Sequence, residues 1–303
     1  MGHALFFGVG GYTSGMLNFH LGVPPVLSIL VGVIMAAVAG LIIGVPALRT
    51  RGPYFSLITL IAPIVLLRAF VFFSDITGGE TGLVGVEKIT FATLPNYYIA
   101  FGVFLFALGV FLAVTRSDAG RVFTAIREDE DAVGAAGLNP AKFKVFAFVL
   151  SGAVGGLAGA VLVHSNVGSV SPNQILSLVI SIEVIIAAIF GGMGTITGAA
   201  IGGFFFFLLR DWLRGVETVI PVIGVTVSEL DLLIFGVVIL GFIFFMPEGV
   251  LRRMIIWSHR IRGGTDAEDT EPVSDGGRTP LRATAEKFVR ELHLILRGDD
   301  NDR

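Results

Sequence analysis

The sequence predicts an all-α, polytopic membrane protein with about seven or eight transmembrane helices. Hydrophobic residues make up 54% of the 303 residues and charged residues only 15%, and the mean hydropathy is +0.84. This composition excludes an ordinary soluble domain. Four stretches, 1–48, 89–115, 145–182 and 184–209, contain no Lys, Arg, Asp or Glu, and each is longer than the roughly 20 residues that a helical span needs. Barrel strands would instead alternate polar and apolar residues over about 10 positions.

Several classes of function are excluded or disfavoured by the same composition. The net charge of −3 does not favour nucleic-acid binding, and the absence of cysteine excludes disulfides, thiolate metal sites and cysteine nucleophiles. The motifs G-x-x-x-x-G-K-[ST], H-E-x-x-H and G-x-S-x-G are all missing, which disfavours an intramembrane enzyme and means that any ATP is hydrolysed by another chain. No basic segment follows Met1, so we expect no cleavable signal peptide.

Apolar segments bounded by charged or turn residues define the candidate spans. In chain order they are 24–48, 53–73, 97–115, 145–163, 175–190, a short one at 196–209, and 230–246, with the glycine-rich segment 4–19 as a candidate eighth. If the spans alternate in direction, one side of the membrane receives Arg49, Arg51, Arg116, Arg121, Arg127, Lys142, Lys144, Arg252, Arg253, Arg260 and Arg262, and the other receives Lys88, Arg210 and Arg214. The positive-inside rule makes the first side cytoplasmic.

A densely charged segment, 116–144, separates two of the apolar runs and falls on this cytoplasmic side. Ser117 and Asp118 are residues that begin helices, Gly137 is typical of a helix end, and Asn139 followed by Pro140 is typical of the next helix start. We therefore expect one helix of about five turns, from about 119 to 136, joined by a tight turn to a span. Composition alone is equally consistent with a solvated charged helix without a role.

The stretch 131–133, DAV, followed after three residues by Gly137, resembles the EAA-x3-G signature of ABC-importer permeases. The Ile-x-Leu-Pro part of that signature is missing, because Ala147 and Phe148 stand in its place, which points away from the commonest importer class. The wider sequence resembles the LivM-type permease of branched-chain amino-acid ABC transporters. Six blocks carry this resemblance in family order: GHALFFGVGGYTSG (2–15), GPYFSLITLI (52–61), TGGETGLVGV (77–86), GRVFTAIREDEDAVGAAG (120–137), SIEVIIAAIFGGMGTITGAAIGG (181–203) and FMPEGVL (245–251).

The resemblance implies a subunit of a heteromeric importer in the cell membrane, built from two related permeases, this chain and a LivH-like one, with two ATP-binding subunits and an external solute-binding protein. ATP and Mg²⁺ would be bound by the ATP-binding subunits, with no cofactor on this chain. The charged segment would be the coupling helix that meets the ATPase. Its implied coupling residues are Arg121, Ala125, Arg127, Glu128, Asp129, Asp131, Ala132 and Gly137. Relatives usually have further spans before the first block, so the resemblance implies a misassigned start or a shortened form.

A translocation path is the second candidate site. Glu183 lies in the middle of a span, where a carboxylate costs roughly 2.5 to 3.5 kcal/mol, so it either lines the path or hydrogen-bonds a neighbouring helix that carries Ser or Asn. Gly191, Gly192 and Gly194, which follow this span, either pack helices together or break a helix whose end faces the solute. Tyr54 and Phe55, at the end of another span, either line the path or anchor the helix at the membrane interface. The candidate path residues are Glu183, Gly191, Gly192, Gly194, Tyr54 and Phe55.

The domain organisation follows from the change in composition after Trp257. Residues 1–257 form the transmembrane permease domain, 258–278 an acidic disordered linker, and 279–303 a cytoplasmic amphipathic helix and tail. That helix lies on the membrane or on this protein, or it docks on a partner subunit. The alternative to an importer subunit is a stand-alone secondary transporter or channel, although such proteins usually keep several intramembrane ionisable residues and only Glu183 lies well inside a span.

Overall fold

The computed structural model describes residues 2–48, 54–192, 194–214, 219–220, 225–226 and 236. Contacts divide the chain into two units, Met1–Arg253 and Met254–Arg303, and every described residue belongs to the first. The predicted linker 258–278 and tail 279–303 lie outside the described residues. So does the predicted span 230–246, apart from Gly236.

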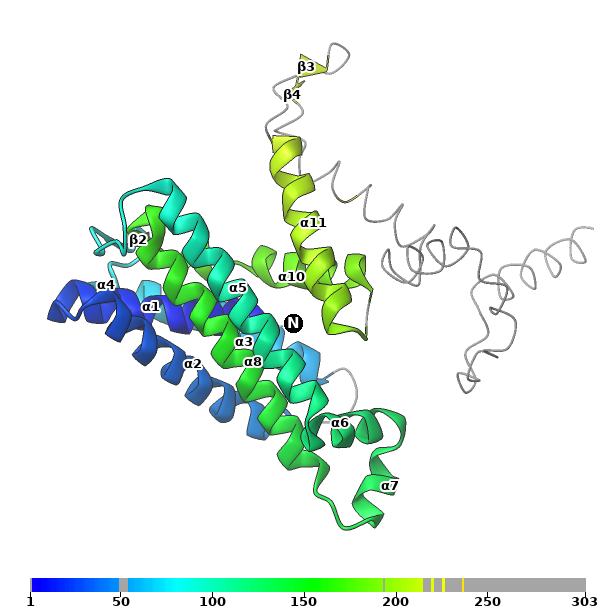
Figure 1. Cartoon of the computed structure of the whole chain (residues 1–303). Coiled ribbons are helices and arrows are strands. Elements are labelled where there is room, and N and C mark those ends of the chain that lie inside the picture. The colour runs from blue at the N-terminus through cyan, green and yellow to red at the C-terminus, as the bar shows by residue number, and fades with distance from the viewer. Residues whose placement is uncertain are drawn as a thin grey trace, which may run out of the picture. The chain divides into compact units, whose positions relative to one another are not determined.

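The described part is helical, with four strands of two residues each (Figure 1). The long helices are α1 (His3–Leu21), α2 (Pro25–Ala47), α3 (Tyr54–Phe72), α5 (Thr93–Arg116), α8 (Pro140–Leu162), α10 (Leu178–Gly191) and α11 (Ile196–Arg214). The short elements are α4 (Ser74–Thr77), α6 (Asp118–Glu128), α7 (Glu130–Ala135), the π-helix η1 (Val163–Val167), α9 (Pro172–Ile175), and the strands β1 (Leu83–Val84), β2 (Ser169–Val170), β3 (Val219–Ile220) and β4 (Val225–Thr226).

Five segments are long and apolar enough to cross a membrane: α2, α3, α5, Pro140–Ser165 and Pro172–Gly191. They confirm the predicted spans 24–48, 53–73, 97–115, 145–163 and 175–190. The candidate eighth segment, 4–19, is helix α1, and the short span predicted at 196–209 is part of α11, which has 19 residues. The protein is therefore a polytopic helical membrane protein.

The helix starts follow local sequence signals. Helix α2 has proline at its first position, and α8 begins with Asn139, whose Oδ1 accepts a hydrogen bond from the Ala141 N–H at 3.0 Å. Helix α10 begins with Ser177, whose Oγ accepts from the Val179 N–H at 3.2 Å. These caps satisfy backbone donors that have no partner inside the helix.

Glycine residues allow α1, α2 and α8 to pack at backbone contact distance. A Cβ placed on Gly10 would overlap the backbone of Gly156 in α8, and a Cβ placed on Gly32 in α2 would lie 2.6 Å from the Gly10 carbonyl oxygen. A Cβ on Gly159 would likewise overlap the backbone of Phe7. In a bilayer, where the hydrophobic effect does not draw helices together, such small residues let backbones approach closely enough for dense packing.

A buried polar cluster joins one end of these three helices to the loop before α5. His164 is fully buried; its Nε2 lies 2.8 Å from Ser14 Oγ in α1 and 3.1 Å from Ser28 Oγ in α2, and its Nδ1 lies 2.7 Å from the Glu87 carbonyl oxygen. The Glu87 N–H donates to Asn18 Oδ1 at 2.8 Å. The loop is also held by the antiparallel pairing of β1 with β2. These contacts satisfy buried polar groups, as a low-dielectric interior requires.

Helices α10 and α11 form a second close pair. A Cβ placed on Gly191 would overlap the backbone of Gly198, and one placed on Gly202 would overlap the backbone of Gly191. The turn between the helices contains Gly192 at φ +111° and Gly194 at φ +97°, backbone conformations that L-residues with a side chain rarely adopt. The glycines in this block thus pack two helices and permit a sharp turn.

Candidate functional site

The charged segment 116–144 forms two short helices, α6 and α7, between the spanning helices α5 and α8 (Figure 1). The prediction of one helix from about 119 to 136 is wrong, because the chain leaves the helical conformation at Asp129, where φ is −153° and ψ is 106°. Asp129 Oδ1 accepts a hydrogen bond from the Ala132 N–H at 3.0 Å, so this residue is the N-cap of α7. An N-cap needs an extended backbone, which ends the preceding helix.

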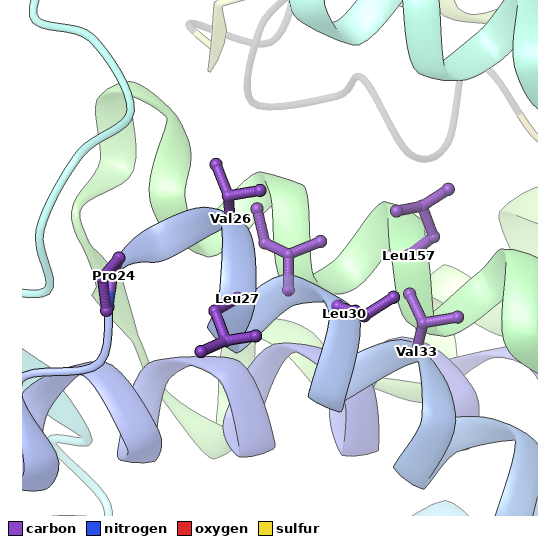
Figure 2. Close-up of a pocket in the computed structure, with 7 residues that line it drawn as sticks. Pro24, Val26, Leu27, Leu30, Val33 and Leu157 are labelled. Atoms are coloured by element: carbon purple, nitrogen blue, oxygen red, sulfur yellow. The ribbon is translucent and has the colours of Figure 1, made fainter.

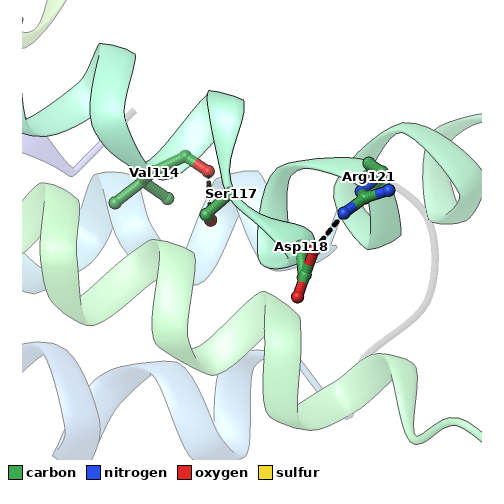
Figure 3. A network of polar contacts seen from close by, with 4 residues as sticks. All are labelled: Val114, Ser117, Asp118 and Arg121. Atoms are coloured by element: carbon green, nitrogen blue, oxygen red, sulfur yellow. Dashed lines mark hydrogen bonds and ion pairs between the residues drawn. The ribbon is translucent and has the colours of Figure 1, made fainter.

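The junction of α5 with α6 is a sharp corner at Ser117 (Figure 3). Ser117 Oγ donates a hydrogen bond to the Val114 carbonyl oxygen at 2.6 Å, which satisfies an acceptor in the last turn of α5. Ser117 is the N-cap residue of α6, as predicted, although it makes no side-chain capping bond there. The Arg121 guanidinium pairs with the Asp118 carboxylate within the first turn of α6.

The far end of the segment is a tight turn of the predicted kind. Gly137 adopts φ +84°, its N–H donates to the Gly134 carbonyl oxygen at 3.0 Å, and the Leu138 N–H donates to the Val133 carbonyl oxygen at 3.3 Å. This is the hydrogen-bond pattern of a Schellman motif, in which glycine avoids the steric cost of the left-handed conformation. Asn139 and Pro140 then begin α8, which confirms the prediction of a helix stop followed by a start.

Both short helices are attached to α8 by side chains. The Phe123 ring of α6 lies 6.1 Å from the Phe143 ring and 6.3 Å from the Phe146 ring, measured between centroids. Lys144 Nζ of α8 lies 2.5 Å from Glu130 Oε2 of α7. Aromatic pairs of this geometry add roughly 0.5 to 1.5 kcal/mol to their burial energy, whereas a half-exposed ion pair adds little. These anchors were not predicted from the sequence, although an aromatic residue within a charged segment was a usable signal.

The predicted coupling residues share one property, which is exposure on this segment. Exposed side chains or backbone are found at Arg121, Ala125, Arg127, Glu128, Asp129, Asp131, Ala132 and Gly137. Five of these eight exposed residues are charged: Arg121, Arg127, Glu128, Asp129 and Asp131. Arg127 differs from the others because its guanidinium also lies beside the turn between α10 and α11: a Cβ on Gly194 would be 3.2 Å from one terminal nitrogen of Arg127.

The mid-span carboxylate Glu183 forms an ion pair across α10 and α11. Its Oε1 lies 2.6 Å from a terminal guanidinium nitrogen of Arg210, and the two side chains are only 15% and 17% exposed. The two alternatives expected for Glu183 were a place on the translocation path or a hydrogen bond to Ser or Asn. Its partner is instead Arg210, an arginine predicted to lie on the outer side of the membrane. An acidic and a basic residue in neighbouring apolar segments predict an ion pair, because each charge alone is costly to insert into a membrane. This signal was present in the sequence.

The other predicted path residues have different surroundings. Gly191, Gly192 and Gly194 lie at the α10–α11 turn. Phe55 packs edge-on against Phe148 of α8, with 5.7 Å between ring centroids, and Tyr54 is 64% exposed at the start of α3. The contacts thus show packing roles for Gly191 and Phe55, and they leave the path assignment of all six residues a prediction.

An apolar groove of about 400 Å³ lies on α2 and α8 (Figure 2). Its lining consists of Pro24, Val26, Leu27, Ile29, Leu30, Val33 and Leu157. These side chains offer no hydrogen-bond partner to a charged or polar ligand. Within the described part of the chain, no group of three or more His, Asp or Glu residues is placed to hold a metal ion.

The family model described as "Branched-chain amino acid transport system / permease component" matches residues 1–243. Among similar proteins, the LivM high-affinity branched-chain amino acid transport permeases of Escherichia coli and Salmonella typhimurium are 27% identical over 284 residues and 28% over 287, each over 83% of this chain. The chain spans 63% of the length of both. The fructose import permease FrcC of Rhizobium meliloti is 29% identical over 62% of this chain and 55% of its own length. No solved structure matches the chain.

Proposed function

Because the chain belongs to the family of permease components of branched-chain amino acid transport systems, we propose that it is the transmembrane subunit of an ATP-driven importer for branched-chain or related small amino acids. The observation that carries this proposal is the exposed α6–α7 segment, held between α5 and α8 and attached to α8 by Phe123 and Lys144. A polar element fixed in this way transmits a push to the spans, which a flexible loop does not.

The proposed assembly contains this chain, a second LivH-like permease, two ATP-binding subunits and an external solute-binding protein. ATP and Mg²⁺ are bound by the ATP-binding subunits, which meet the exposed residues of α6 and α7. The excess of basic residues on the side of 116–144 supports, by the positive-inside rule, the proposal that this segment and the C-terminal tail are cytoplasmic. The spanning helices lie in the cell membrane.

The coupling step follows from the contacts of the segment. Closure of the ATP-binding subunits displaces α6 and α7, and the Phe123 anchor transfers this displacement to α8. Helix α8 moves together with α1 and α2, since their glycine contacts leave no room for sliding. The site between the spans then opens alternately to each side, and the solute crosses without a chemical reaction on this chain.

The Glu183–Arg210 pair argues against the alternative of a stand-alone secondary transporter. Ion-coupled carriers usually keep several intramembrane ionisable residues that bind and release protons or cations. Glu183 is instead paired with Arg210, whose terminal guanidinium nitrogen lies 2.6 Å from its carboxylate oxygen. The structure thus engages this acid in an internal ion pair rather than leaving it available to a coupling ion.

The test is reconstitution in liposomes. This chain is purified alone and with the ATP-binding subunits, second permease and binding protein of the proposed assembly, and uptake of radiolabelled leucine, isoleucine, valine and fructose is measured with and without internal ATP. Uptake that requires both ATP and the complete assembly, with preference for an amino acid, supports the proposal. ATP-independent uptake by this chain alone would overturn it in favour of the stand-alone transporter, and preference for fructose would overturn the assigned solute class.

A further inference from the structure

We propose that Arg127 is a positioning residue that connects the α6–α7 segment to the turn between α10 and α11, an inference that rests on the proposed function. A Cβ built on Gly194 would lie 3.2 and 3.6 Å from the two terminal guanidinium nitrogens of Arg127. The side chain of α6 thus reaches a turn 67 positions further along the chain. Its charged end is placed against the backbone of that turn.

The chemistry of the turn suits a guanidinium group. Helix α10 ends at Gly191, so the carbonyl oxygens of its last turn lack helical N–H partners and carry the negative end of the helix dipole. Arginine supplies five N–H donors in a planar group and no acceptor, so it complements such a surface. Gly194, at φ +97°, both permits the turn and leaves the space that a side chain would occupy.

The contact provides a second way in which a displacement of the α6–α7 segment can reach the spanning helices. The first route is the packing of Phe123 on α8. Through Arg127, displacement of α6 also reaches α10 and α11, which are fastened to each other by the Glu183–Arg210 ion pair and by the contact of Gly191 with Gly198. Displacement of α6 therefore acts both on α8 with α1 and α2 and on α10 with α11.

The first test measures coupling in the reconstituted assembly. We compare Arg127→Ala with Arg127→Lys, and use Lys142→Ala as the control, because Lys142 is an exposed cation at the start of α8 and lies outside α6 and α7. ATP hydrolysis and leucine uptake are measured on the same liposomes. We expect Arg127→Ala to lower the uptake per ATP hydrolysed about two- to fivefold, the range that a cation at a helix C-terminus gives, with ATP hydrolysis retained. Arg127→Lys is expected to keep most of the uptake, because it keeps the charge.

The second test measures proximity without any transport. Since the chain contains no cysteine, Arg127→Cys combined with Thr195→Cys creates a unique pair for a short bis-maleimide cross-linker, and Arg121→Cys with Thr195→Cys is the control. We expect efficient intramolecular cross-linking of the first pair and little of the second. This experiment works on the chain in native membranes, so its result holds even if the reconstituted assembly does not transport.

Two results would overturn the inference. Equal cross-linking of both pairs would show that Arg127 is not held at the turn. An uptake per ATP that is unchanged in Arg127→Ala, in an assembly whose unmodified form transports leucine, would show that the contact does not transmit movement. Failure of the unmodified assembly to transport would instead refute the proposed function, while the cross-linking result would still decide the contact.

Discussion

Removing the charge of Glu183 while Arg210 remains should strongly destabilise the α10–α11 pair. The two charged atoms are 2.6 Å apart, so their attraction at an effective dielectric constant of about 20 is about 6 kcal/mol before desolvation is subtracted. Both side chains are more than four-fifths buried, so the unpaired Arg210 of a Glu183→Gln variant would remain a poorly solvated cation. Loss of one partner from a buried pair costs about 3 to 5 kcal/mol, and we expect about 3 kcal/mol because the pair keeps some solvent contact.

A double-mutant cycle measures this interaction. Glu183→Gln, Arg210→Gln and the combined variant are unfolded by SDS titration in mixed micelles, followed by intrinsic tryptophan fluorescence. The combined variant should be more stable than the sum of the two single losses predicts, with a coupling energy of about 1 to 3 kcal/mol. The exposed pair of Glu130 with Lys144 is the control, for which we expect about 0.2 to 1 kcal/mol.

The same variants decide whether Glu183 has a role beyond packing. If the pair only fastens α10 to α11, the combined neutral variant should regain much of the ATP-driven uptake that each single variant loses. A combined variant that is stable and yet inactive would indicate that Glu183 lines the translocation path. Additive losses of stability, within about 0.3 to 0.5 kcal/mol, would refute the electrostatic reasoning altogether.

Three further predictions concern the segment and the core. Gly137→Pro should leave membrane insertion intact yet abolish uptake per ATP hydrolysed, because proline cannot adopt φ +84°; normal uptake by this variant would count against coupling through the segment. Phe123→Ala should release α6 from α8, seen as faster proteolysis between 116 and 144 in inside-out vesicles, whereas unchanged digestion would contradict the anchor. His164→Ala should lower the free energy of unfolding by about 1 to 3 kcal/mol in the same SDS titration, since the Ser14 hydroxyl and the Glu87 carbonyl lose a buried partner; a thermodynamically neutral variant would refute that role.

The membrane helices could be predicted from the sequence because their signal is local. An apolar run that is long enough to cross a bilayer and has at most one charged residue inside it has few alternatives to a spanning helix, and the structure confirms five of the predicted spans. The turn at Gly137 and the helix start at Asn139 and Pro140 were predictable for the same reason. Each depends on the backbone preference of one or two residues.

The features that could not be predicted depend on residues far apart in the sequence or on competing local signals. The Glu183–Arg210 pair and the contact of Arg127 with Gly194 exist only once the helices are packed. The break at Asp129 arose because an aspartate in a run of acids can cap a new helix as readily as it can continue the old one. A count of charged residues does not distinguish these two outcomes.

The glycine contacts of α1, α2 and α8 also limit how this molecule can change shape. Where backbones touch, adding even one methyl group at Gly10 would force two helices apart, so these three cannot shear against one another. Any conformational change must therefore carry them as a single rigid body, with rotation confined to its boundaries with the remaining helices. Distance measurements between labelled helices should accordingly find constant separations inside this trio throughout a transport cycle, and variable ones only across its edges.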